Sequence, residues 1–159
     1  MQNYLIAIIL VFSGPALAEF DFQSYQAASY TELKAQHTDL LQAGKKSDHV
    51  ISASSRKYVI PVVFIKELRE LSAANKTVIK AWQTSLRVPD GFIDLYQHEF
   101  KAEFKGETIW IPVQERLLLP MSSELHPGDR FKLFVVVIGA KYNKLVLLAT
   151  EFKSDRAPL

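Results

Sequence analysis

The chain of 159 residues has no cysteine, and its formal net charge is only +2. Without cysteine it can form no disulfide, so packing alone must stabilise the folded state, which a chain of this length permits. Lys and Arg are spread through both halves of the sequence. They form no stripe of the kind that follows a phosphate backbone, so we expect no nucleic-acid partner.

The sequence also lacks the spacings of a metal or cofactor site. No two of its histidines have the separation of a helical metal-binding pair or of a zinc ribbon; they are His37, His49, His98 and His126. It has neither a nucleotide-binding loop nor a serine on a nucleophile elbow. We therefore expect no metal and no cofactor, and we assign no catalytic residue.

One long apolar run stands at the amino terminus. Leu5 to Phe12 is uninterrupted and is followed by Gly14, Pro15 and small residues that end at Ala18. A membrane-spanning helix needs about 20 apolar residues, whereas this layout is typical of a cleaved secretory signal. We expect residues 1–18 to be removed as a signal peptide and no transmembrane anchor to remain. An exported chain without disulfides fits a periplasmic or secreted bacterial protein.

Apolar residues recur at helical spacing in the first half of the chain. Between Phe22 and Gly44 they predict an amphipathic helix that Ser29 or Thr31 caps and Gly44 ends. The apolar face of this helix carries Tyr30, Leu33, Leu40 and Leu41. His37 lies on the same face and is expected to be a hydrogen-bonded core residue.

Two further helical segments are predicted before the pattern changes. Residues 49–71 are expected to be helical with a kink or a break at Pro61. A third helix is expected to begin after the cap Ser72 and to bury Val78, Ile79, Trp82 and Leu86. The segment 19–88 is therefore predicted to be a helical region.

After Gly91 the apolar period becomes that of a strand. His98, Phe100, Ala102 and Phe104 alternate with polar residues up to the turn Lys105-Gly106. A two-residue loop places the apolar residues of both strands on one side, with Phe104 opposite Glu107, Ala102 opposite Ile109, Phe100 opposite Ile111 and His98 opposite Val113. A longer loop would send Ile109 and Ile111 to the polar face.

The most apolar part of the sequence is the hairpin that ends the chain. The segments 131–139 and 145–152 are apolar on both faces, so each face should be covered. Leu117 to Met121 is expected to add a short strand before them. The sequence thus predicts an α+β fold, in which an N-terminal helical segment of about three helices precedes a five-stranded antiparallel β-barrel of SH3-like or OB-like type. The barrel would span 92–153, and residues 154–159 would form a flexible tail.

Two surfaces are candidates for binding. Trp110 is directed to the outer face of the predicted hairpin, opposite Lys101, which can lie over the indole. Either a neighbour from the helical region, near Trp82, covers the rest of the indole, or the indole is a binding platform. Lys141, Tyr142 and Lys144 form the second surface, at a hairpin tip where turn composition also explains the lysines.

These features predict an exported, non-enzymatic binding or adaptor protein of the bacterial periplasm. Its partner would be another exported or envelope protein, or a glycan, bound through the exposed aromatic and basic side chains. The alternative is a small periplasmic hydrolase that uses His98, near a strand end, or His126, in a turn. The oligomeric state is left open.

Overall fold

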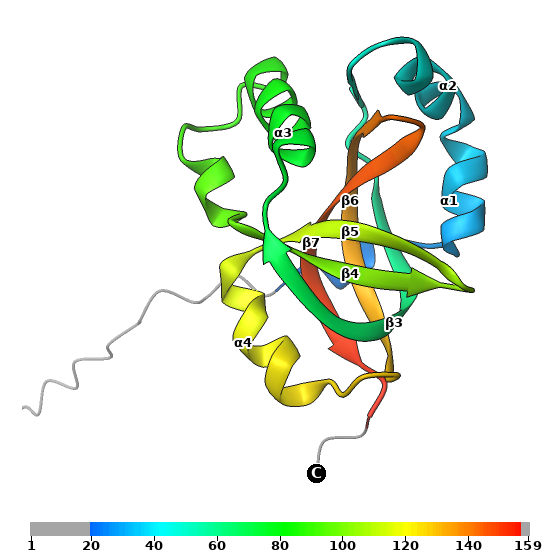
Figure 1. Cartoon of the computed structure of the whole chain (residues 1–159), viewed down its shortest axis with the longest axis vertical. Helices are drawn as coiled ribbons and strands as arrows, with labels where there is room; N and C mark the ends of the chain where they lie inside the picture. Colours follow the sequence, from blue (N-terminus) through cyan, green and yellow to red (C-terminus); the bar gives the residue numbers. More distant parts are fainter. Residues whose placement is uncertain (1–19, 157–159) are drawn as a thin grey trace, which may run out of the picture.

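The computed structural model describes residues 20–156, and the predicted signal peptide, residues 1–18, lies outside them. The centre of the molecule is a closed β-barrel (Figure 1). Going round it, each strand pairs with the next in the order β3-β4-β5-β7-β6, and β6 pairs again with β3. The five strands are β3 (Lys57–Glu70), β4 (His98–Phe104), β5 (Glu107–Val113), β6 (Arg130–Lys141) and β7 (Lys144–Ser154).

The helices are interleaved with these strands, so the chain is an α+β protein without a separate helical half. Helices α1 (Tyr30–Gln36) and α2 (Thr38–Lys46) precede the barrel, α3 (Ala73–Ser85) lies between β3 and β4, and α4 (Glu115–Glu124) lies between β5 and β6. Short elements complete the fold: η1 (Phe22–Ser24), β1 (Gln26–Ala27), β2 (Val50–Ile51) and η2 (Phe92–Leu95). Within residues 20–156, none of the helices combines the length and the apolarity that crossing a bilayer requires.

The second predicted helix is wrong, because residues 57–70 form the longest strand. Tyr58, Ile60, Val62 and Phe64 are buried, with exposed or partly exposed residues between them. This period of two was hidden in the sequence because Val59 and Val63, on the other face, are apolar as well. Pro61 lies inside the strand, faces solvent and pairs with Lys132 of β6.

Strand β3 closes the barrel by changing its partner along its length. Its first half, residues 57–63, pairs with β6, and its second half pairs with β4 up to Glu70. Val63 pairs with both neighbours, and a bulge between Phe64 and Leu68, with Lys66 at a positive φ of 62°, then shifts the register with β4. The end of β3 therefore runs beside β4 on the outer side of the barrel, where Arg69 stands opposite Glu99.

The predicted strand at Leu117 to Met121 is wrong too, because these residues belong to α4. Leu117, Met121 and Leu125 are buried and recur at four-residue steps, while Leu119 is 77% exposed. Burying each of the three is worth about 1.5–3 kcal/mol, which together exceeds the cost of about 3 kcal/mol for Pro120 inside a helix. The free energy gained by burying Leu117, Met121 and Leu125 therefore exceeds the cost of Pro120, and the segment is helical.

The two predicted hairpins are confirmed. The pairs of β4 with β5 are those expected from the two-residue turn, including Phe104 with Glu107 and Lys101 with Trp110. The turn of the β6–β7 hairpin has Tyr142 and Asn143 at positive φ angles of 50° and 62°. One pairing corrects the predicted antiparallel barrel, because β5 and β7 are parallel and meet only at Val113 and Ala149.

Both faces of the β6–β7 hairpin are covered, as predicted. One face lies in the barrel core, and the other packs under α3 with Val78, Ile79 and Trp82. Ser29 caps α1 as expected, by a reciprocal pair of hydrogen bonds with Glu32. Gly44 does not end the first helical segment. It lies inside α2, where a Cβ atom would be 3.1 Å from Cβ of Ala140, so its role is close packing.

His37 is a core histidine, as predicted. Its Nε2 lies 3.0 Å from the hydroxyl of Tyr58, and this hydroxyl donates to Oε1 of Gln36 at 3.0 Å. Because the hydroxyl of Tyr58 donates its only proton to Gln36, it must accept the hydrogen bond from His37, so Nε2 of the imidazole carries a proton. Burial, together with the positive charge of Arg56, lowers the pKa of His37 from its ordinary value of 6.5.

The lowered pKa of His37 makes stability depend on pH in a defined direction. The unfolded chain binds the proton more readily than the folded one, so the contribution of neutral His37 is complete above its ordinary pKa and is lost as the pH falls through the folded pKa. Urea unfolding of the wild type and His37→Gln at about pH 7.5 and about pH 5 measures this contribution. The wild type should lose more stability on acidification, and an equal loss in both proteins would contradict the assignment.

Candidate functional site

A groove lies on the outer side of the barrel between β5 and β7, and we call it the β5–β7 groove. It has a volume of about 320 Å³. It exists because the two strands pair only at Val113 and Ala149 and separate toward their amino-terminal ends. Its walls come from the end of β3, the start of α3, β5 and the β6–β7 turn: Arg69, Ser72, Ala74, Asn75, Thr108, Ile109, Trp110, Lys141, Tyr142, Lys144, Leu145 and Val146.

One wall of the groove is organised by a buried carboxylate. Glu99 on β4 is fully buried, although it lies on the outer face of its strand. Nε of Arg69 donates to it at 2.5 Å, Nδ2 of Asn75 at 2.6 Å and Oγ of Ser72 at 3.2 Å. These three donors satisfy a charge that burial alone would make costly. The carboxylate thereby joins the end of β3 and the first turn of α3 to β4.

The same ion pair places a cation on Trp110. The guanidinium carbon of Arg69 is 4.0 Å from the indole centroid, and Nζ of Lys101 is 5.7 Å away. Lys101 is also paired with Glu67 at 3.1 Å. The residue that covers the indole is therefore Arg69 of β3. Trp82 lies instead in the apolar cluster under α3, where its indole nitrogen donates to Oγ of Ser55 at 2.9 Å.

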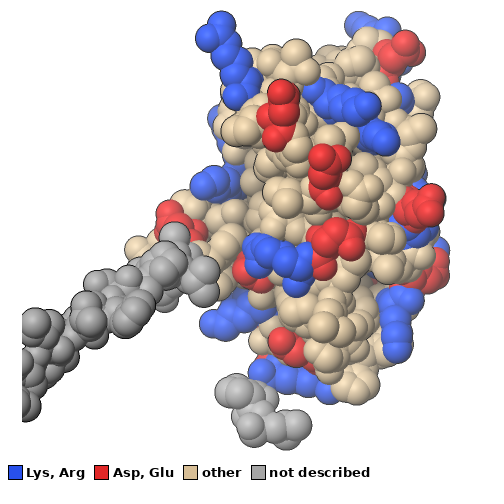
Figure 2. Space-filling view, turned by 90° about the vertical axis from the view of Figure 1, so that its left-hand side faces the viewer, with Lys and Arg blue, Asp and Glu red and all other residues tan. Residues whose placement is uncertain are grey.

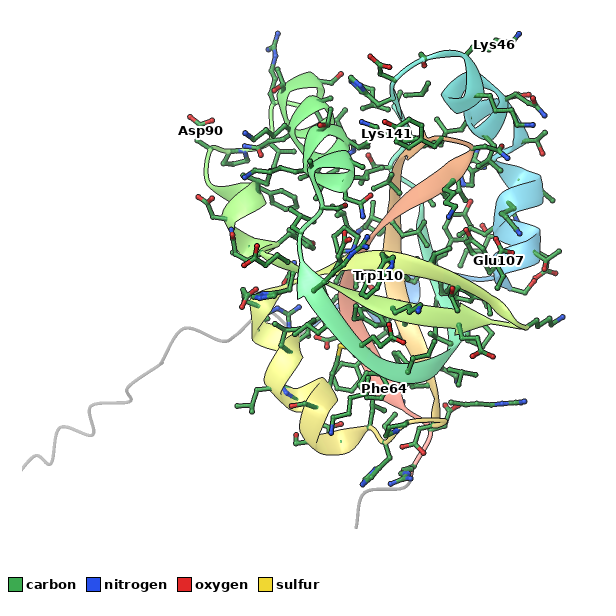
Figure 3. The ribbon with its side chains drawn as sticks, viewed as in Figure 1. Lys46, Phe64, Asp90, Glu107, Trp110 and Lys141 are labelled. Atoms are coloured by element: carbon green, nitrogen blue, oxygen red, sulfur yellow. The ribbon has the colours of Figure 1, made fainter. Side chains whose placement is uncertain are left out.

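The second predicted surface forms the opposite wall of the groove. Tyr142 is 70% exposed at the tip of the β6–β7 turn, and Nζ of Lys141 lies 5.1 Å from its ring centroid. Trp110 and Lys141, both labelled in Figure 3, thus line one groove although 31 residues separate them in the sequence. The structure brings together Trp110, Lys141, Tyr142 and Lys144, and Lys101 flanks them beside the indole.

The charge of the groove has one sign. Three cations line it, Arg69, Lys141 and Lys144, and its lining contains no carboxylate. Arg69 is neutralised by Glu99, whereas in the part of the chain that the structure describes neither lysine has a carboxylate within 4.0 Å. By contrast, basic and acidic side chains are interspersed on the side that carries α3 and α4 (Figure 2). The groove therefore favours a negatively charged ligand.

The histidines considered for a hydrolase lie outside this groove. Nδ1 of His98 is 2.5 Å from a carboxylate oxygen of Glu115, and Nδ1 of His126 is 2.9 Å from the guanidinium of Arg156. Neither ring is hydrogen-bonded to a hydroxyl group among residues 20–156. The same described range holds no group of three or more His, Asp or Glu side chains arranged to bind a metal ion.

Sequence reasoning missed the residues that build the first wall. Glu99 is one of the polar residues that alternate with the apolar face of the predicted strand, and this pattern predicts an exposed position, where ion pairs contribute little. Its partners Arg69 and Asn75 lie 30 and 24 residues away in the sequence, and no local spacing connects them. The sequence could have predicted the contact of Arg69 with Glu99 as an oppositely charged pair on neighbouring strands, but only if β3 had been recognised as a strand.

Comparisons of this chain with protein-family models, with curated proteins and with solved structures found no match.

Removing Arg69 should destabilise the fold more than removing an exposed cation. Arg69→Met leaves the carboxylate of Glu99 buried with neutral donors only, and we expect a loss of about 3 kcal/mol. Lys101→Met removes an exposed ion pair and should cost at most about 1 kcal/mol. Urea unfolding measures both.

The double variant Arg69→Met/Glu99→Gln provides the control for this explanation. It removes the buried charge together with its partner, and the amide still accepts hydrogen bonds from Ser72 and Asn75. It should therefore be more stable than Arg69→Met alone. Equal costs for Arg69→Met and Lys101→Met would show that Glu99 does not depend on the guanidinium.

Proposed function

We propose that this chain is an exported, non-enzymatic binding protein of the bacterial periplasm that holds its partner in the β5–β7 groove. The observation that carries the proposal is the convergence of two aromatic side chains, Trp110 and Tyr142, and two lysines, Lys141 and Lys144, on one open groove whose lining has no carboxylate. Aromatic and arginine side chains contribute most of the energy in many binding sites. The partner is an exported or envelope protein, or a glycan, that carries negative charge.

The barrel is best described as OB-like. In chain order its last strand, β7, lies between the third and the fourth, β5 and β6, which is a Greek-key arrangement. Five-stranded, partly open Greek-key barrels bind ligands over their second and third strands, between the loops that join strands 1–2 and 4–5. In this chain these parts are β4 and β5, the β3–β4 connection with α3, and the turn at Tyr142. The β5–β7 groove lies among them, which supports the assignment.

The side chains of the groove suit binding rather than catalysis. They are cations, amides, hydroxyls, aromatics and aliphatics, and neither a histidine nor a carboxylate is among them. General acid–base catalysis most often uses a histidine or a carboxylate. The alternative hydrolase would rely on His98 or His126, which do not line the groove.

Reversing the charge of one wall tests the proposal. The full chain, tagged at its carboxyl end, is produced in a bacterial host and recovered from the periplasm with its bound partners. Lys141→Glu/Lys144→Glu should reduce partner recovery by about tenfold or more, because two attractive charges become repulsive. The matched control, Lys45→Glu/Lys46→Glu, makes the same change in charge at the end of α2, outside the groove (Figure 3).

The outcome separates groove binding from non-specific attraction. Partners should remain bound to the control variant at the level of the wild type. Equal losses in both variants would mean that only net charge matters. If no partner is recovered from the periplasm with the wild type, the proposed function is wrong.

A further inference from the structure

Among residues 20–156, the edge of β5 that faces away from β4 is paired with another strand only at Val113, and the rest of this edge lies along the β5–β7 groove. The two-residue turn makes Phe104 and Glu107 a hydrogen-bonded pair, and pairs alternate from there along β4 and β5. Thr108 and Trp110 consequently occupy non-hydrogen-bonded positions, so their N–H and C=O groups point away from β4. That direction leads into the groove, where the only strand pairing of β5 with β7 is at Val113.

The edge has a defined length. Pro112 is the next residue of β5 whose backbone faces away from β4, and as a proline it has no N–H group. Two complete donor–acceptor sets therefore remain, at Thr108 and Trp110, and they are about 7 Å apart at roughly 3.4 Å per residue. On the other side of the groove, Leu145 of β7 has the corresponding orientation, because Lys141 and Lys144 close the neighbouring hairpin as a hydrogen-bonded pair.

We propose that the partner binds through an extended acidic peptide segment, which adds as a short strand along the edge of β5 between Thr108 and Trp110. This inference rests on the proposed function and names the ligand of the same groove. The segment forms main-chain hydrogen bonds with β5, and its outward side chains lie between Trp110 and the lysines of the β6–β7 turn. Carboxylates at those positions pair with Lys141 and Lys144, which have no carboxylate partner among residues 20–156.

The geometry favours a peptide over a glycan. An extended peptide repeats its donors and acceptors with the spacing of the free edge, whereas a sugar chain has no such repeat. Sugars commonly stack on an aromatic face, but Arg69 already lies 4.0 Å from the indole centroid of Trp110. Glu99 fixes that guanidinium, so the occupied face of the indole is part of the folded structure.

The experiment begins with a displayed library of random 12-residue peptides, selected against the immobilised protein. We expect the retained peptides to be rich in Asp and Glu. The best peptide is then synthesised, and its dissociation constant is measured by fluorescence anisotropy. Two versions of the same sequence, with N-methyl groups on the odd or on the even residues, serve as probes that lack the backbone donors along one edge or the other.

Thr108→Pro tests the edge directly. It removes the N–H that faces the groove and none of the hydrogen bonds to β4, and Pro112 shows that this orientation in β5 accommodates proline. The loss of one main-chain hydrogen bond should weaken peptide binding about tenfold. Thr108→Val changes the side chain without removing the N–H and should bind within about threefold of the wild type. Thermal melts show whether both variants are folded. If Thr108→Pro is unfolded, the test of the added strand rests on the N-methylated peptides alone.

Each result has a defined meaning. Enrichment of acidic peptides, with binding weakened by Thr108→Pro or by N-methylation, supports the added strand. Retained peptides without acidic residues, or acidic peptides that bind as well after both changes, overturn it. If a tetramer of galacturonic acid binds, loses affinity with Lys141→Glu/Lys144→Glu and keeps it with Thr108→Pro, the ligand is a glycan and the groove function stands. If neither the peptides nor the tetramer binds the wild type, the inference and the proposed function both fail.

Discussion

The buried carboxylate of Glu99 is the constraint on which the rest of the site depends. A charge on a fully buried group costs several kcal/mol unless donors surround it, and here the donors come from the end of β3 and the first turn of α3. These segments must therefore lie against β4. Their position aligns Arg69 with the indole of Trp110 and fixes one wall of the groove.

The opposite wall and the opening follow from strand geometry. Two-residue turns at Lys105-Gly106 and Tyr142-Asn143 set the registers of both hairpins, and the register decides which backbone groups face the groove. Because β5 and β7 pair only at Val113 and Ala149, the barrel is closed at that pair. Toward the amino-terminal ends of the two strands it is open, and the groove lies there. The closed part provides rigidity, and the open part provides a free edge beside two lysines. The proposed peptide would therefore bind without a rearrangement of the barrel, which limits the ordering cost of association.

Local patterns in the sequence predicted the elements that local chemistry determines. The β4–β5 register followed from the alternation around one turn, Ser72 was recognised as a cap, and Ser29 was one of two candidates for the cap of the first helix. Strand β3 could not be recognised, because it is apolar on both faces and contains Pro61. The groove could not be predicted either. It depends on the contact of Arg69 with Glu99, across 30 residues, and on a parallel pairing that no turn specifies.

Residue-by-residue amide hydrogen exchange, followed by NMR on the protein without a partner, tests the free edge of β5 most directly. The N–H groups of Ile109 and Ile111 face β4 in the observed register, and those of Thr108 and Trp110 face the groove. We predict slow exchange at Ile109 and Ile111 and fast exchange at Thr108 and Trp110. Similar protection at all four positions would mean that the edge is already paired, and it would contradict the account.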